Sequence, residues 1–348
     1  MCKLTGLLLF ALLPCCLIWP RARRLWRSLT AAFCLGLLVI NAGYLFEGSL
    51  TPIGQYSFDS PPMKAVAAFL PRWLPVPLPR YFFQGLDAQL AESGYTAYLL
   101  GQFNTSGFYT YYLVALLVKT PAPTLLLLGL ACVYGGRPSW REMPLMLTAA
   151  VLFLFFSLSG HKNIGLRYIL FLEPMMAVWI GRLLASPTTA ATWLRRTILG
   201  ATVCLGGIAL ASWPHYLPYF NWLSGGPDRG HRWLLDSNLD WGQDLVALAR
   251  YQRRERIAEI DLAYFGRVPP EVYGIRYRTL RAGEAPRNRY VAISANLLWG
   301  LTYIVNGDLN YWPDDPAGYA AFRARKPVAI LGHSIYLFHV GEGAMTAK

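Results

Sequence analysis

The stretch that decides the fold runs from residues 213–223, WPHYLPYFNWL, to residues 236–245, DSNLDWGQDL. The first segment follows an apolar run and contains five aromatic rings, which are typical of the headgroup level of a bilayer. In the second segment, Asp240 and Gln243 form the pattern that caps a helix beginning at Trp241. The sequence therefore predicts a passage from a membrane domain to an aqueous domain at this point.

The composition supports a membrane assignment. Of 348 residues, 55% are hydrophobic and only 15% are charged, a balance typical of membrane proteins. Lys and Arg cluster between apolar runs before residue 213, whereas residues 214–348 mix both signs. The net charge of +13 therefore indicates basic cytoplasmic loops and excludes a nucleic-acid binder.

The apolar runs predict about six membrane spans. They lie at residues 4–19, 29–46, 120–134, 144–159, 166–184 and 198–213. The first run also has the features of a signal peptide, although no small-residue cleavage site follows it. The basic flanks place both termini outside the cytoplasm. The predicted domains are a transmembrane domain at 1–213, with an external loop at 47–108, and an extracytoplasmic domain at 214–348.

The tail has an α/β pattern. Alternating or short apolar segments predict strands at 260–265, 275–280, 290–294, 328–331 and 335–340. A helix is expected after Trp241, and another is expected where Asp315 precedes a proline. The predicted fold class is thus an α-helical multi-pass membrane protein followed by a C-terminal external α/β domain. The cysteines and histidines show no metal-binding spacing, so no metal site is predicted.

Four blocks of the sequence carry a resemblance to a known family. They are residues 119–121 (KTP), 159–168 (SGHKNIGLRY), 214–221 (PHYLPYFN) and 236–245 (DSNLDWGQDL). In order and spacing they resemble the C-terminal half of bacterial GT-C-type membrane glycosyltransferases related to the protein O-mannosyltransferases. The resemblance covers roughly residues 44–340.

The resemblance implies an enzyme that takes a sugar from a polyprenyl-phosphate carrier and passes it to a lipid, glycan or protein acceptor. It also implies a multi-pass protein of the bacterial inner membrane, with the C-terminal domain outside the cytoplasm. Such enzymes place catalytic acids in an early external loop, but residues 47–108 contain no adjacent acidic pair. We therefore expect the chain to represent the C-terminal part of such an enzyme, to bind the carrier, and to leave the donor sugar in place. The alternative is a non-catalytic membrane subunit whose external domain binds a partner or glycan.

Four cations fall on the predicted outer side of the membrane. Lys119, His161, Lys162 and Arg167 are candidates for contact with the carrier phosphate. Each can equally anchor the protein to ordinary lipid phosphates. Arg167 is the strongest candidate, because a guanidinium holds two phosphate oxygens in its fork.

The acidic candidates are weaker. Asp59 and Glu173 are candidate catalytic bases, although Asp59 lies in a sequence typical of a turn and Glu173 lies inside a predicted span. A second group, at the domain junction, braces the tail or contacts a glycan. Its members are Asp236, Asn238, Asp240 and Asp244.

Overall fold

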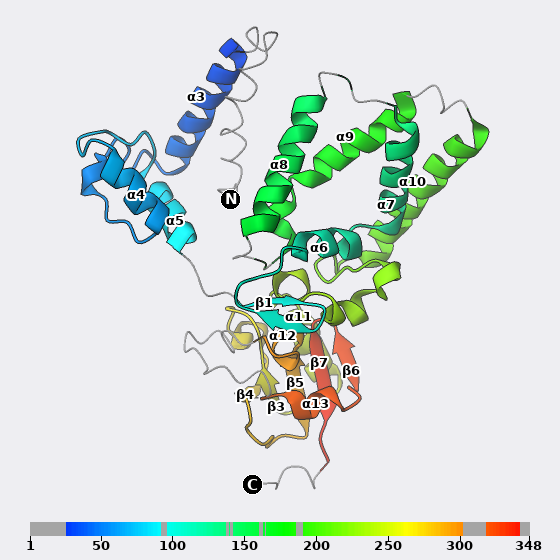
Figure 1. Cartoon of the computed structure of the whole chain (residues 1–348). Helices are drawn as coiled ribbons and strands as arrows, with labels where there is room; N and C mark the ends of the chain where they lie inside the picture. Colours follow the sequence, from blue (N-terminus) through cyan, green and yellow to red (C-terminus); the bar gives the residue numbers. More distant parts are fainter. Residues whose placement is uncertain are drawn as a thin grey trace. The chain divides into compact units, whose positions relative to one another are not determined.

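The computed structural model describes residues 26–91, 96–136, 139, 142–159, 163, 165–185, 191–301 and 318–341. The chain forms two compact units, Met1–Gly94 and Tyr95–Lys348 (Figure 1). The domains expected from the sequence, 1–213 and 214–348, have their boundary after residue 213 and not after Gly94. This division stays a prediction.

The first unit is a helix followed by a small folded segment. Its elements are α3 (Trp26–Gly43), η3 (Ile53–Gln55), α4 (Pro61–Phe69) and α5 (Arg80–Ala91). Ile53, Met63 and Val76 are buried together. Asp87 accepts hydrogen bonds from the N–H groups of Asp59 (2.7 Å) and Ser60 (3.1 Å). The segment between α3 and α5 therefore has its own core, held at the start of α4 by one buried carboxylate.

The second unit combines helices with a sheet. Its helices are α6 (Tyr111–Lys119), α7 (Ala122–Tyr134), α8 (Met143–Ser159), η4 (Leu166–Ile169), α9 (Leu172–Ala185), α10 (Thr192–Ser212), η6 (Trp222–Ser224), η7 (Pro227–Arg232), η8 (Asp236–Asn238), α11 (Leu245–Arg254), η9 (Pro270–Tyr273), α12 (Ala295–Leu298) and α13 (Ala320–Arg323). In Figure 1, α6 lies between the group α7–α10 and the sheet. One buried core runs from Tyr112 and Ala115 of α6 to Phe338 of the sheet, so these parts of the unit pack as one body.

The prediction of about six membrane spans is wrong. Among the described residues, α10 is the only single helix long and apolar enough to cross a bilayer, and α6 with α7, bent by 111°, adds at most a second. The apolar parts Phe33–Gly43 and Met146–Leu158 are too short for the ~20 residues that a span requires. The first predicted span, at 4–19, lies outside the described residues. The multi-pass membrane location that rested on these spans is corrected with them.

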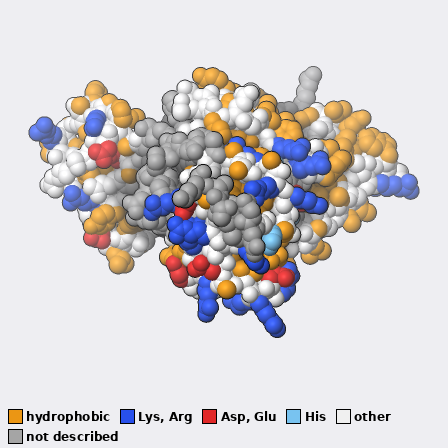
Figure 2. Space-filling view, turned by 90° about the horizontal axis from the view of Figure 1, so that it is seen from below, with side chains coloured by type: hydrophobic (Ala, Val, Ile, Leu, Met, Phe, Trp, Pro, Cys, Tyr) orange, Lys and Arg blue, Asp and Glu red, His pale blue; other side chains and the backbone are white. Residues whose placement is uncertain are grey.

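The physical reason is that hydropathy does not show where a helix ends. The run predicted at 120–134 forms α7, which begins only after Pro121, a residue without a backbone N–H, and has 13 residues. The run at 166–184 begins as the short η4, and α9 has only 14 residues. Apolar side chains nevertheless lie on the surface in Figure 2, and Val203 and Leu210 of α10 are 68% and 80% exposed.

The tail contains a five-stranded mixed sheet in the order β4-β3-β5-β7-β6. The strands are β3 (Ile260–Ala263), β4 (Tyr277–Thr279), β5 (Tyr290–Ser294), β6 (Ala329–Leu331) and β7 (Ile335–His339), all within the predicted segments. β3 pairs in parallel with β4 and β5, whereas β7 is antiparallel to β5 and β6. A separate two-stranded sheet joins β1 (Ala97–Leu99) to β2 (Gln102–Asn104).

The two faces of the large sheet are buried in different cores. Along β5, Val291 and Ile293 belong to the core shared with α6, whereas Ala292 packs with Leu248 of α11. This alternation follows from the two-residue period of a strand. Because both faces are covered, the sheet is a rigid base for the loops at its ends.

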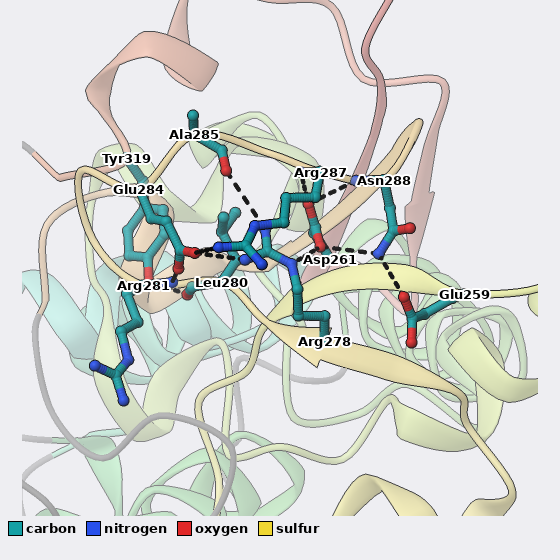
Figure 3. A network of polar contacts seen from close by, with 10 residues as sticks. All are labelled: Glu259, Asp261, Arg278, Leu280, Arg281, Glu284, Ala285, Arg287, Asn288 and Tyr319. Atoms are coloured by element: carbon teal, nitrogen blue, oxygen red, sulfur yellow. Dashed lines mark hydrogen bonds and ion pairs between the residues drawn. The ribbon is translucent and has the colours of Figure 1, made fainter. Parts of the chain in front are cut away.

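A polar network closes one end of the sheet (Figure 3). Asp261 of β3 is fully buried and accepts from Arg278 Nε of β4 at 2.7 Å. It also accepts from the N–H groups of Arg287 (2.6 Å) and Asn288 (3.0 Å). Burial alone would raise the pKa of Asp261, but these donors lower it below the ordinary value. The network therefore ties the loop before β5 to the sheet and has a structural role.

The helix after Trp241 begins later than predicted. Gly242 has φ of +74°, which is not helical, so α11 starts at Leu245. Asp240 accepts from Gly242 N at 2.8 Å, and Gln243 Oε1 accepts from Trp241 N at 2.7 Å. These bonds form a turn ahead of the helix. The helix expected at Asp315 lies outside the described residues.

Candidate functional site

The four sequence blocks meet in one place in the second unit. Lys119 Nζ donates to the carbonyls of Leu217 (2.7 Å) and Asn238 (2.6 Å). Leu166 N donates to Asn238 Oδ1 at 3.0 Å. Segments separated by up to 119 residues are thus joined by direct hydrogen bonds. We call this region the junction.

Asn238 is the centre of these contacts. It is 2% exposed, and its Nδ2 donates to Tyr111 Oη (2.8 Å) and to the Leu235 carbonyl (3.0 Å). Its side chain is therefore occupied on both the donor and the acceptor side. Lys119 lies 4.4 Å from the centre of the Phe220 ring, so its ammonium group is directed into the junction.

Asn221 is a junction residue that the sequence did not single out as a site. It is fully buried, and its Nδ2 donates to the carbonyls of Leu117 (2.6 Å) and Thr120 (2.9 Å). These carbonyls lie at the end of α6, where the chain breaks before α7 and leaves acceptors without helical partners. Only the tertiary structure shows that a residue 101 positions later supplies the donor.

The junction is packed closely around Gly165. A Cβ at this position would lie 2.3 Å from Ser237 Oγ, so the serine side chain would have to shift. The φ of Gly165 is extended, so space and not backbone conformation requires glycine. The segment before Arg167 is thereby held directly against the segment that contains Asp236.

Arg167 is positioned by aromatic rings. Its guanidinium lies 4.3 Å from the centre of the Trp241 ring and 5.3 Å from that of Tyr168. Trp241 is 54% exposed, so this stack lies at the protein surface. Such stacking orients the plane of the guanidinium, a group that recognises oxyanions.

Asp236 has an unusual backbone and an altered acidity. Its φ of +60° is uncommon for a residue other than glycine and often marks a functional site. Its N–H donates to Asn296 Oδ1 at 2.7 Å, which holds this conformation. Burial raises its pKa to about 6, against the lowering effects of the Ser237 N–H and the Arg167 charge. A carboxyl group that exchanges protons near neutral pH therefore lies within the field of an arginine.

Asp240 is buried more deeply. It is fully buried, and burial raises its pKa to about 8 despite the hydrogen bond from Gly242 N. Within the described part of the chain, its Oδ2 has no hydrogen-bond partner. Asp240 is therefore a neutral acid at pH 7 and belongs to the packed interior, where it contacts no solvent.

We expect Asp240→Asn to become more stable than the wild type as pH rises. The folded chain retains a proton up to about pH 8 that the unfolded chain releases near 3.8, so the wild type loses stability between these values. Asparagine imitates the neutral acid and does not ionise. Thermal unfolding at pH 5 and pH 9 should show a difference in Tm that is small at pH 5 and larger at pH 9. Equal destabilisation at both pH values would contradict the assignment.

The other site residues predicted from the sequence do not contribute to the contacts described above. Asp59 is exposed, in the first unit. Glu173 lines a cavity of about 360 Å³ among α7, α9 and α10. Asp244 accepts from Ser334 Oγ at 2.7 Å, next to the junction. His161 and Lys162 lie outside the described residues.

Comparison with known proteins gives no relative for the chain. No protein-family model matches the sequence, and neither a curated protein nor a solved structure shows a significant match. The glycosyltransferase resemblance therefore rests on the four blocks alone.

Proposed function

We propose that this chain binds a polyprenyl-phosphate-linked sugar at the junction and transfers the sugar to an acceptor hydroxyl. Arg167 contacts the carrier phosphate, and Asp236 accepts the proton of the acceptor. The observation that carries this proposal is that the charge of an arginine stacked on Trp241 acts on Asp236, a residue with a positive φ and a pKa raised to about 6. Arg167 and Asp236 come from different sequence blocks. Their proximity is therefore a result of the tertiary fold and not of neighbouring positions in the sequence.

The phosphate role of Arg167 follows from its geometry. A guanidinium forms two parallel hydrogen bonds to phosphate oxygens, and the Trp241 ring limits the directions in which it can point. As the sugar leaves the carrier, negative charge grows on the phosphate, and a fixed cation stabilises that charge. Lys119 lies in the same junction, but its Nζ already donates to two carbonyls, and burial lowers its pKa to about 7, so its charge at neutral pH is partial.

The base role of Asp236 follows from its pKa. A general base works best when its pKa lies near the working pH, because it is then ionised and still basic. The ordinary value for an aspartate is 3.8, which is too acidic for efficient proton transfer. Burial of Asp236 provides the required rise. This assignment replaces the sequence-based expectation that the base lies outside the chain.

We expect the full chain to bind carriers through their phosphate. In a detergent-solubilised preparation, a fluorescent polyprenyl phosphate should bind and be displaced by a polyprenyl-phosphate sugar. Free polyprenol of the same length should displace it far less, because it lacks the group that Arg167 contacts. Equal displacement by polyprenol would show that the apolar tail alone is recognised and would contradict the proposal.

A carrier-binding subunit without catalysis is the second candidate. This candidate is favoured because the polar groups of Lys119 and Asn238 already form hydrogen bonds between segments of the chain. Both candidates predict carrier binding. They differ in whether a labelled sugar moves to an acceptor, and in whether that transfer depends on Asp236.

A further inference from the structure

A second candidate site includes Asp244 but neither Arg167 nor Asp236. Here the structure contains a cavity of about 760 Å³, lined by the chain that follows α10, by one face of α11 and by β6. Trp213, Leu217, Val246 and Leu331 supply apolar walls. The cavity borders the junction, since Leu217 contributes to both, but neither Arg167 nor Asp236 is among its lining residues.

The α11 side of the cavity is basic. Arg250 and Arg254 both line it, and they are four residues apart, which places them on one helix face. Arg254 Nε pairs with Glu255 at 2.8 Å, whereas Arg250 has no ion pair with any described residue. His215 lines the same cavity and adds a further charge when protonated.

One acid, Asp244, also lines the cavity, and its carboxylate has several partners. Its carboxylate accepts from Ser334 Oγ (2.7 Å) and Gln243 Nε2 (3.0 Å). It lies 3.5 Å from His215 Nδ1. Gly332 makes this arrangement possible, because a Cβ there would lie 2.0 Å from the carboxylate. The cavity lining therefore carries two arginines against one carboxylate, so basic side chains outnumber acidic ones.

The position of the cavity indicates the kind of ligand. α10 ends at Ser212, and the next residue, Trp213, is 70% exposed and already lines the cavity. α10 is the one single helix in the described residues with the length and hydropathy of a membrane span. A ligand with an apolar chain along α10 would therefore place its headgroup between Trp213 and the arginines of α11.

We propose that this cavity binds the phosphate headgroup of an anionic lipid. The arginines contact the phosphate oxygens, and the walls next to Trp213 contact the first carbons of the lipid chain. Aromatic and basic residues together are typical of such contacts, because the ring lies at the headgroup level and the cation meets the phosphate. The site needs neither Arg167 nor Asp236, so it is independent of sugar transfer.

The test is equilibrium binding of fluorescent phosphatidylglycerol to the full chain in detergent micelles. The double variant Arg250→Gln/Arg254→Gln should bind about 30-fold more weakly, because each basic residue near an anionic headgroup contributes about tenfold or less to affinity. Ala247→Phe, which fills the cavity without changing charge, should also weaken binding. Ala247 lines the cavity on the same helix.

The matched control is Arg253→Gln. Arg253 belongs to the same helix but lies outside the cavity, with Nη1 3.4 Å from the Tyr273 carbonyl. It should bind the lipid as the wild type does, and unlabelled phosphatidylcholine should compete poorly. Equal loss in the Arg253 variant would overturn the site. Competition by phosphatidylcholine as strong as that by phosphatidylglycerol, or displacement of the lipid by millimolar inorganic phosphate, would overturn the anionic-lipid assignment.

Discussion

Asp236→Asn is expected to lower the rate of sugar transfer by about 10²–10⁴-fold, the range over which a general base acts. Asparagine keeps the size and the acceptor oxygen of the side chain but cannot take a proton from an acceptor hydroxyl. It also tolerates the backbone conformation with φ of +60°, because asparagine is enriched there. The variant should therefore fold and should still bind a polyprenyl phosphate.

The pH dependence adds a second readout. Because the pKa of Asp236 is raised to about 6, the wild-type rate should rise with pH through 6 and then level off. Below that value the carboxyl group is protonated and cannot accept a proton. The residual activity of Asp236→Asn should lack this inflection. An unchanged rate in the variant, or equal loss of carrier binding and transfer, would show that Asp236 has a structural role only.

Arg167→Ala is expected to weaken carrier binding by about 10- to 150-fold, since a hydrogen bond to a charged group contributes about 1.5–3 kcal/mol. Arg167→Lys should recover part of the affinity, because lysine keeps the charge and loses the planar fork. Binding of a fluorescent polyprenyl phosphate to each purified variant measures both effects.

The control for Arg167 is Arg267→Ala. Arg267 is an exposed arginine of the same unit, so its loss changes the net charge equally without touching the junction. It should bind the carrier as the wild type does. If both alanine variants lose the same affinity, the carrier responds to the overall charge of the protein, and Arg167 has no specific phosphate contact.

The strands were predictable from the sequence because their pattern is local. In β5, Val291 and Ile293 enter one core and Ala292 the other, which produces the continuous apolar run that the sequence shows. The spans were not predictable in the same way. Whether an apolar run forms one long helix depends on where that helix begins and ends, as in the run at 166–184, where α9 has only 14 residues, and hydropathy averages over such ends.

The candidate site was predictable only in part. The four blocks were found as sequence patterns, but their meeting depends on single contacts, such as that of Lys119 with Asn238. The strain at Asp236 arises because Asn296, which is 60 positions away, holds its N–H. The acidity of Asp236 and Asp240 depends on burial, and no neighbouring residue in the sequence reports it.

The most direct measurement of the central claim is transfer of a labelled sugar from a polyprenyl-phosphate donor by the full chain, with Asp236→Asn and Asp59→Asn assayed beside the wild type. Asp59 is the exposed acid of the first unit that the sequence offered as a base, and its substitution removes the same charge. If Asp236 is the base, the wild type and Asp59→Asn transfer the sugar, and Asp236→Asn loses transfer. Transfer that survives in Asp236→Asn and disappears in Asp59→Asn would contradict it.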